Sequence, residues 1–238
     1  RIMKKLLTTL LGTIITLALF AQSTNDNTLK FLGHPIDGSK SEMEKHLISR
    51  GFTYDSDYDS YRGIFNGKNA NIFISTNKDN VDRVYVAFNK QRNEADIINE
   101  YNTLLRQFKR NEKYTSLSEN LEIPTDENIS FEMSVHNKTY QATFYLKSQL
   151  DTLAIVEEFT SLCSEEQIEK IMSTDFSNLD TFDFSENADI LQIILAITKK
   201  SMEYITGCVW FTIHKGYGTY QIGLYYDNLN NRPNGEDL

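Results

Sequence analysis

The stretch YRGIFNGKNANIFISTNKDNVDRVYVAF, residues 61–88, contains three short segments in which apolar and polar residues alternate. Alternation with a period of two is typical of strands that bury one face. Asn66-Gly67, the strongest short signal for a hairpin, joins the first two segments, and the polar turn NKDN joins the second to the third. The stretch therefore predicts an antiparallel meander over 61–65, 70–76 and 84–88.

Helices are predicted on both sides of this meander. Ser39 and Glu42 have the spacing of a capping box, and Gly51 supplies the left-handed residue that ends many helices. A helix is therefore expected over 39–50. After the meander, Asn93 precedes an apolar stripe with helical spacing, which predicts a second helix within 93–114.

The second half of the chain repeats this mixture of elements. Strands are predicted over 129–135 (ISFEMSV), 140–146, 208–214 and 220–226, and helices within 150–172, where Ser164 caps EEQIEKIM, and over 188–207. The fold class is therefore α+β, with antiparallel sheet meanders packed against amphipathic helices. A helix–three-strand–helix unit is expected over 22–116, a polar linker over 117–127, and a second α+β unit with a helical insertion over 128–238. One continuous domain is the alternative.

The N-terminal segment MKKLLTTLLGTIITLALFAQS, residues 3–23, is typical of a secretory signal peptide. Lys4 and Lys5 precede an apolar run of 16 residues, from Leu6 to Ala21, which is shorter than the roughly 20 residues of a spanning helix. An uncleaved anchor is the alternative. Cleavage after residue 21 predicts an exported, periplasmic or secreted protein.

The charge of the chain is strongly acidic, with a formal net charge of −9. Without residues 1–21, which contain three basic residues and no acidic one, 21 basic residues remain against 33 acidic ones, a net charge of −12. Such a chain repels phosphate backbones and anionic lipid surfaces. We therefore expect no nucleic-acid partner and no membrane association after cleavage.

Asp55, Asp57 and Asp59 alternate as the first ligands of an EF-hand calcium loop do. The rest of that pattern fails, because position 6 is Ser60 instead of glycine and position 12 is Asn66 instead of glutamate. The sequence favours an acidic turn. A weak calcium site formed by the three aspartates is the alternative, and no other cofactor is expected.

Catalytic motifs give no positive signal: the chain contains no G-x-S-x-G, H-E-x-x-H or C-x-x-C. Cys163 and Cys208 are expected to form a disulfide in an oxidising compartment, with two free thiols or a nucleophile as alternatives. Whether the protein is an enzyme stays open, and a non-catalytic role is favoured. The rival hypothesis is an envelope hydrolase that acts on glycan or peptide through dispersed carboxylates.

Several tyrosines near turns or in paired runs are candidates for a binding surface: Tyr58, Tyr61, Tyr217, Tyr220 and Tyr225. Exposed tyrosine suits contacts with protein or glycan. The alternative interpretation is that these side chains only border the sheet. The final segment, YYDNLNNRPNGEDL, is expected to be a solvated tail.

The segments GHPIDGSKSE (33–42), YRGIFNG (61–67) and YYDNLNNRPNGEDL (225–238) resemble a group of uncharacterised exported bacterial proteins. Those proteins share a G-x-P-I-D-G-S-K-S-E start and a Y-Y-D-N…N-G-E-D-L end, and the resemblance implies compartment and fold, without an activity. More loosely, the helix and meander are similar to β-lactamase-inhibitor-protein-like modules, which bind other proteins. We expect an exported binding or envelope-associated protein whose partner is an envelope protein or a glycan.

Overall fold

The computed structural model describes residues 28–116, 118, 121–146, 157, 159–173, 192–193, 195–196, 199–200 and 205–233. The chain divides into two compact units. The sheet unit contains residues 28–116, 120–146 and 206–238, and the other unit contains residues 1–27, 117–119 and 147–205. The predicted signal peptide and most of the helix expected over 188–207 lie outside the described residues.

Helix α6 (Glu165–Ser173) belongs to the second unit. Its first turn is capped as predicted, because Ser164 Oγ accepts a hydrogen bond from the backbone N–H of Gln167 at 3.2 Å. The Gln167 side chain in turn accepts from the backbone N–H of Ser164 at 2.9 Å.

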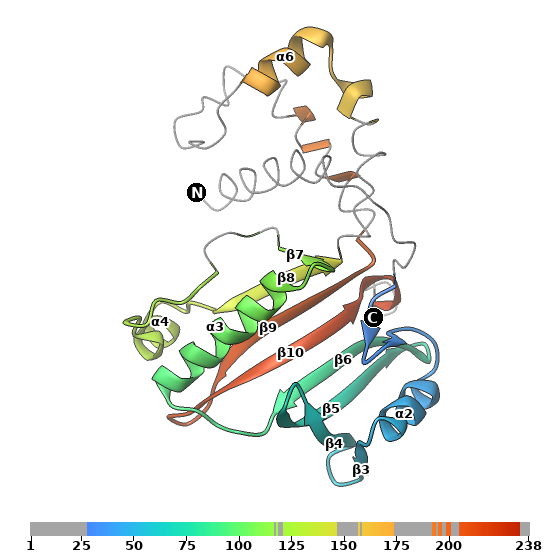
Figure 1. Cartoon of the computed structure of the whole chain (residues 1–238), viewed down its shortest axis with the longest axis vertical. Helices are drawn as coiled ribbons and strands as arrows, with labels where there is room; N and C mark the ends of the chain where they lie inside the picture. Colours follow the sequence, from blue (N-terminus) through green and yellow to red (C-terminus); the bar gives the residue numbers. More distant parts are fainter. Residues whose placement is uncertain are drawn as a thin grey trace. The chain divides into compact units, whose positions relative to one another are not determined.

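The sheet unit is built on an antiparallel sheet of eight strands in the order β3-β4-β5-β6-β10-β9-β8-β7 (Figure 1). The strands are β3 (Thr53–Asp55), β4 (Ser60–Phe65), β5 (Lys68–Asn77), β6 (Asn80–Phe88), β7 (Tyr114–Thr115), β8 (Gln141–Leu146), β9 (Gly207–Lys215) and β10 (Tyr220–Asn228). A separate pair consists of β1 (Lys30–Phe31) and β2 (His34–Pro35). Because β6 pairs with β10, strands from both predicted helix–sheet units form one sheet, and the α+β class is confirmed.

The first half of the chain forms the elements that its local signals predict. Helix α2 (Lys40–Ser49) begins with the capping box of Ser39 and Glu42. At its end, Gly51 has φ +88°, and the backbone N–H groups of Gly51 and Phe52 bind the carbonyls of Ile48 and Leu47, as in a Schellman motif. Between β4 and β5, Asn66 and Gly67 both have positive φ, as a type I′ hairpin turn requires.

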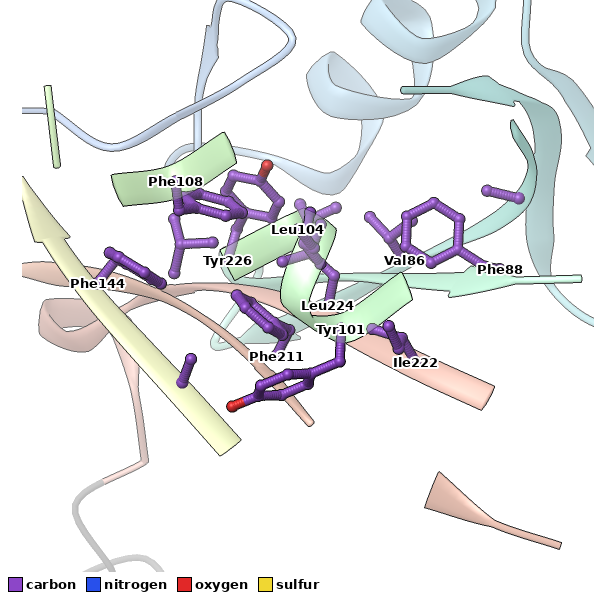
Figure 2. Close-up of a cluster of buried hydrophobic side chains, with 14 of the residues drawn as sticks. Val86, Phe88, Tyr101, Leu104, Phe108, Phe144, Phe211, Ile222, Leu224 and Tyr226 are labelled. Atoms are coloured by element: carbon purple, nitrogen blue, oxygen red, sulfur yellow. The ribbon is translucent and has the colours of Figure 1, made fainter. Parts of the chain in front are cut away.

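The hydrophobic core lies between one face of the sheet and the helices α2 and α3 (Glu94–Arg110). Alternate residues of the strands point into this core. The apolar stripe of α3 packs on β9 and β10. The rings of Tyr101 and Phe211 meet edge to face with their centroids 5.0 Å apart. Figure 2 shows part of this core: Val86, Phe88, Tyr101, Leu104, Phe108, Phe144, Phe211, Ile222, Leu224 and Tyr226.

The predicted strand over 129–135 is wrong: this segment is helix α4 (Ile129–Val135). Asn128 caps the helix by accepting a hydrogen bond from the N–H of Phe131 at 2.9 Å. Lys215, at the end of β9, donates to the carbonyl of Ser130 and to the hydroxyl of Ser134. Ile129 is buried but Phe131 and Val135 are exposed, so the alternating pattern does not mark one buried face. Polar tertiary contacts decide the structure of this segment.

The described part of the predicted linker, residues 121–127, packs against α3. Ile123 is buried, and Arg106 and Glu122 form an ion pair at 2.6 Å. The buried Asn102 side chain donates to the Ile123 carbonyl at 2.7 Å and accepts from the Ile123 N–H at 2.9 Å. A single side chain therefore satisfies both backbone polar groups of Ile123.

We expect Asn102→Ala to lower the free energy of unfolding by at least about 2 kcal/mol, because it leaves a buried N–H and a buried C=O of Ile123 without partners. Asn99→Ala is the matched control, because Asn99 is exposed on the same helix and its loss should change stability by less than about 0.5 kcal/mol. Urea unfolding measures both variants. Equal midpoints for the two would contradict this account of the segment.

Candidate functional site on the outer face of the sheet

The sheet has a second face, opposite the core, on which four aromatic side chains lie in one row across four strands. Strand register places Phe73 of β5 opposite Tyr85 of β6, Tyr85 opposite Tyr225 of β10, and Tyr225 opposite Trp210 of β9. All four side chains are half-buried. We call these four residues the aromatic row.

The rings of the aromatic row stack face to face. Their centroids are 5.5 Å apart between Phe73 and Tyr85, 4.5 Å between Tyr85 and Tyr225, and 3.9 Å between Tyr225 and Trp210, with interplanar angles of 23°, 15° and 8°. These separations are close to the spacing of neighbouring strands. Each ring therefore turns its faces toward its neighbours, and its edge points away from the sheet.

Asp227, on the same face of β10, fixes one side of the row. Its carboxylate is fully buried and accepts hydrogen bonds from Arg83 Nε at 2.6 Å, Arg83 Nη2 at 3.2 Å and Trp210 Nε1 at 2.6 Å. Arg232 adds a further charged hydrogen bond through Nη2. The Arg83 guanidinium also lies over the rings of Trp210 and Tyr225, at 5.7 and 5.4 Å from their centroids. The hydrogen bond from Trp210 Nε1 to Asp227 holds the indole in one orientation. The hydrogen bonds that Arg83 donates to Asp227 raise the pKa of Arg83.

The other side of the row is polar. His214 Nε2 lies 3.0 Å from the Tyr225 hydroxyl, and Tyr225 also bonds to the Tyr85 hydroxyl. Gly223 makes room for the imidazole, since a Cβ at that position would lie 2.6 Å from His214 Nε2. Burial, reinforced by the neighbouring Tyr85, raises the pKa of Tyr225 to about 12, so both phenols are neutral at physiological pH.

The part of the outer face formed by β5, β6, β10, β9 and β8 carries few charges for a chain in which 24% of residues are Asp, Glu, Lys or Arg, whereas Arg62 and Asp55 occupy outward positions of β4 and β3. Arg83 and Asp227 are the only residues of these four types at the outward positions of β5, β6, β10, β9 and β8. By register, these positions are Asn69, Asn71, Phe73, Ser75, Arg83, Tyr85, Ala87, Gln221, Gly223, Tyr225, Asp227, Cys208, Trp210, Thr212, His214, Gln141, Thr143 and Tyr145. The solvated face of an antiparallel sheet usually carries polar side chains, so a row of aromatic rings at its centre is the unusual feature of this face.

The predicted calcium ligands have other partners in the structure. Asp55 forms an ion pair with Arg62 and accepts from the N–H of Asp57 at 3.2 Å. The two oxygens of Asp59 bind Lys40 Nζ at 3.2 Å and the hydroxyl of Tyr54 at 3.0 Å, and these bonds lower the pKa of Asp59. Within the described parts of the chain, no group of three or more His, Cys, Asp or Glu side chains is arranged to hold a metal ion. Asp57 and Asp59 lie in the turn between β3 and β4, and Asp55 is the last residue of β3. A weak calcium site at these residues stays a prediction.

The five predicted surface tyrosines lie in different environments. Tyr61 and Tyr220 point into the hydrophobic core and are 4% exposed, so their assignment to a surface is wrong. Tyr58 and Tyr217 are exposed in the turns after β3 and β9. Only Tyr225 belongs to the aromatic row. The sequence patterns did not single out Trp210 or Tyr85 as outward residues, although the alternation that buries Val84, Val86 and Phe88 already implied that Tyr85 points the other way.

The C-terminal segment is only partly the solvated tail that its composition suggests. Asp227 and Asn228 are the last residues of β10, and Leu229–Asn231 form the 3-10 helix η3. Asn231 Nδ2 donates to the carbonyl of Val81 at 2.9 Å and to Asp37 Oδ1 at 2.8 Å. These contacts hold the segment after β10 against the sheet, where Arg232 donates a hydrogen bond to Asp227.

The two cysteines are free thiols in this structure and belong to different units, so their pairing stays a prediction. Cys208 is buried on the outer face of β9, opposite Asp227. Burial, with the nearby Asp227, raises the pKa of its thiol to about 11. At neutral pH the thiol is protonated, which makes Cys208 a poor nucleophile.

We expect Asp227→Asn to lower the free energy of unfolding by about 1–3 kcal/mol, because it removes the charge that compensates the partly exposed Arg83 and Arg232. Asp57→Asn, in the exposed acidic turn, is the control and should change stability by less than about 0.5 kcal/mol. Urea unfolding followed by the fluorescence of Trp210, the single tryptophan, measures both. Comparable losses in the two variants would show that Asp227 does not organise this face.

His214 should make stability depend on pH. Although the residue as a whole is exposed, its ring lies over Gly223, and this partial burial lowers its pKa below the ordinary value near 6.5. As the pH falls below 6.5, the unfolded chain binds the proton first, so the free energy of unfolding falls. Unfolding of wild type and His214→Gln from pH 7.5 to pH 5 should show a smaller loss in the variant. Identical pH profiles of the two proteins would contradict the conclusion that burial of His214 lowers its pKa.

Comparisons with protein-family models, with curated proteins and with solved structures each gave no match. Across the described residues, no helix combines the length and apolar character needed to cross a membrane. The resemblances drawn from sequence motifs stay predictions. The candidate site therefore rests on the geometry of the outer face.

Proposed function

We propose that this chain is an exported, non-catalytic protein that binds another protein through the outer face of its sheet. The observation that carries the proposal is the aromatic row: four stacked, half-buried rings, of which Trp210 is held by Asp227, on a part of the sheet face with few charged residues. The N-terminal signal-peptide pattern supports export to the periplasm or the medium.

The composition of the outer face favours a protein as the partner. Cores of protein–protein interfaces are depleted in charged residues and enriched in Tyr, Trp, Phe and Arg. Trp, Tyr and Arg also dominate the residues whose truncation weakens binding most. Trp210, Tyr85, Tyr225 and Arg83 belong to these types and lie side by side in the row and its Asp227 contacts.

The orientation of the rings favours protein over glycan. A sugar ring packs on the exposed face of an aromatic ring, but here the faces of Tyr85 and Tyr225 contact each other and their neighbours. What remains accessible are ring edges and hydroxyl groups. The row is also held rigidly before any partner arrives, which lowers the conformational entropy lost on binding.

Among the described residues, no comparable observation favours the hydrolase alternative. A cavity of about 60 Å³ lies between α3 and the β4–β5 hairpin, and Glu100 is the single carboxylate among its lining residues. Glu100 is bound to Lys68 and Arg92, each at 2.6 Å. This cavity is far smaller than the roughly 300 Å³ of small ligand pockets, and its carboxylate serves to attach α3 to the sheet.

Site-specific photo-crosslinking in cells that express the protein tests the proposal. Ser75 of β5 and Gln141 of β8 are exposed outward positions on opposite sides of the row, so a crosslinking residue at either leaves the row intact. Both positions should capture the same protein, and Tyr85→Ala should reduce the yield. Arg106, exposed on α3 on the opposite side of the sheet, is the control position and should capture none.

Two outcomes would contradict the proposal. One is capture from Arg106 with the same yield as from Ser75 and Gln141. The other is the absence of a crosslinked protein from both outer-face positions while the protein is folded and present at its normal level.

A further inference from the structure

The outer face presents its positive groups and hides its negative ones. Asp227 has no exposed side-chain area, whereas the side chains of Arg83 and Arg232, which bind it, are 35% and 38% exposed. Asp82, the other acidic residue that acts on Arg83, is also buried. A partner that approaches this side of the row therefore meets two guanidinium groups before it meets a carboxylate.

The bonds to Asp227 use only part of each guanidinium. Arg83 binds through Nε and Nη2, and Arg232 binds through Nη2. A guanidinium has five N–H groups and no acceptor. Within the described part of the chain, the N–H groups outside these bonds are open to water or to acceptor oxygens of a partner, and carboxylates bind guanidinium groups most strongly.

The aromatic row adds to this preference. An aromatic ring is electronegative on its face and electropositive at its edge. Because both faces of Tyr85 and Tyr225 and one face of Trp210 are covered by stacking within the row, the partner meets mainly ring edges. Guanidinium N–H groups and ring edges together make a surface that complements electron-rich oxygen atoms.

We propose that the partner protein contacts this face with an acidic segment, whose carboxylates bind Arg83 and Arg232 while its chain crosses the aromatic row. This inference rests on the proposed protein-binding function and names the chemistry of the partner. The net charge of −9 repels an acidic partner from the rest of the chain, which directs it to the face whose carboxylates are hidden.

The test uses the purified full-length chain and two peptides of matched shape, hexaglutamate and hexaglutamine. The readout is the indole N–H signal of Trp210 in NMR, which is unique because the chain has one tryptophan. Hexaglutamate should shift this signal saturably, and hexaglutamine should bind at least about tenfold more weakly. Equal binding of the two peptides, or no shift with hexaglutamate, would overturn the inference.

Substitutions locate the interaction. Arg232→Gln should weaken hexaglutamate binding about fivefold or more, and Arg232→Lys, which keeps the charge, should restore most of it. Arg106→Gln removes the same charge from the opposite side of the sheet and should leave binding unchanged. Equal weakening by Arg232→Gln and Arg106→Gln would reveal a non-specific charge effect and overturn the assignment to this face.

The crosslinking experiment separates this inference from the function on which it rests. Capture of one protein from Ser75 and Gln141 requires no particular chemistry in the partner. If that capture succeeds while hexaglutamate fails, the binding function stands and the acidic partner is wrong. If hexaglutamate binds while no protein is captured, the face recognises acidic peptides but the proposed partner protein is contradicted.

Discussion

The buried carboxylate of Asp227 is the interaction on which the rest of the outer face depends. Burying a charge is costly unless it is paired and fully hydrogen-bonded, and here two guanidinium groups and an indole N–H meet that condition. These partners come from β6, from β9 and from the segment after η3. The same carboxylate therefore ties β10 to both of its neighbouring strands and returns the C-terminal segment to the sheet.

This constraint also determines what the aromatic row can do. With Trp210 held by Asp227 and Tyr225 stacked on Trp210 at 3.9 Å, the rings have little freedom to rotate and expose their faces. A row of fixed ring edges binds through complementarity in shape and charge. The outer face is therefore a rigid surface, which differs from the adaptable loops on which Tyr58 and Tyr217 lie.

Much of the fold was predictable wherever a structure depends on neighbours in sequence. The capping box of Ser39, the left-handed turn at Asn66-Gly67 and the apolar stripe of α3 are set within a few residues, and all are present. The segment 129–135 was predicted wrongly, because its period-two pattern outweighed the local cap signal of Asn128 and says nothing of the contacts with Lys215, which lies far away in sequence. The pairing of β6 with β10 is equally non-local, and no local signal indicates it.

The candidate site could not be predicted in full because it, too, depends on pairing between strands that are far apart in sequence. Period-two alternation already places Tyr85 opposite to Val84 and Val86, and Tyr225 lay among the candidate tyrosines, but only register shows that the two rings are neighbours. Register also shows that the carboxylate of Asp227 lies beneath the arginines that neutralise it. A net charge describes a chain, whereas a partner responds to the charges within about a Debye length of the contact, roughly 8 Å at physiological ionic strength. Beside the aromatic row, the exposed members of this ion-pair network are guanidinium groups, although the chain as a whole is acidic.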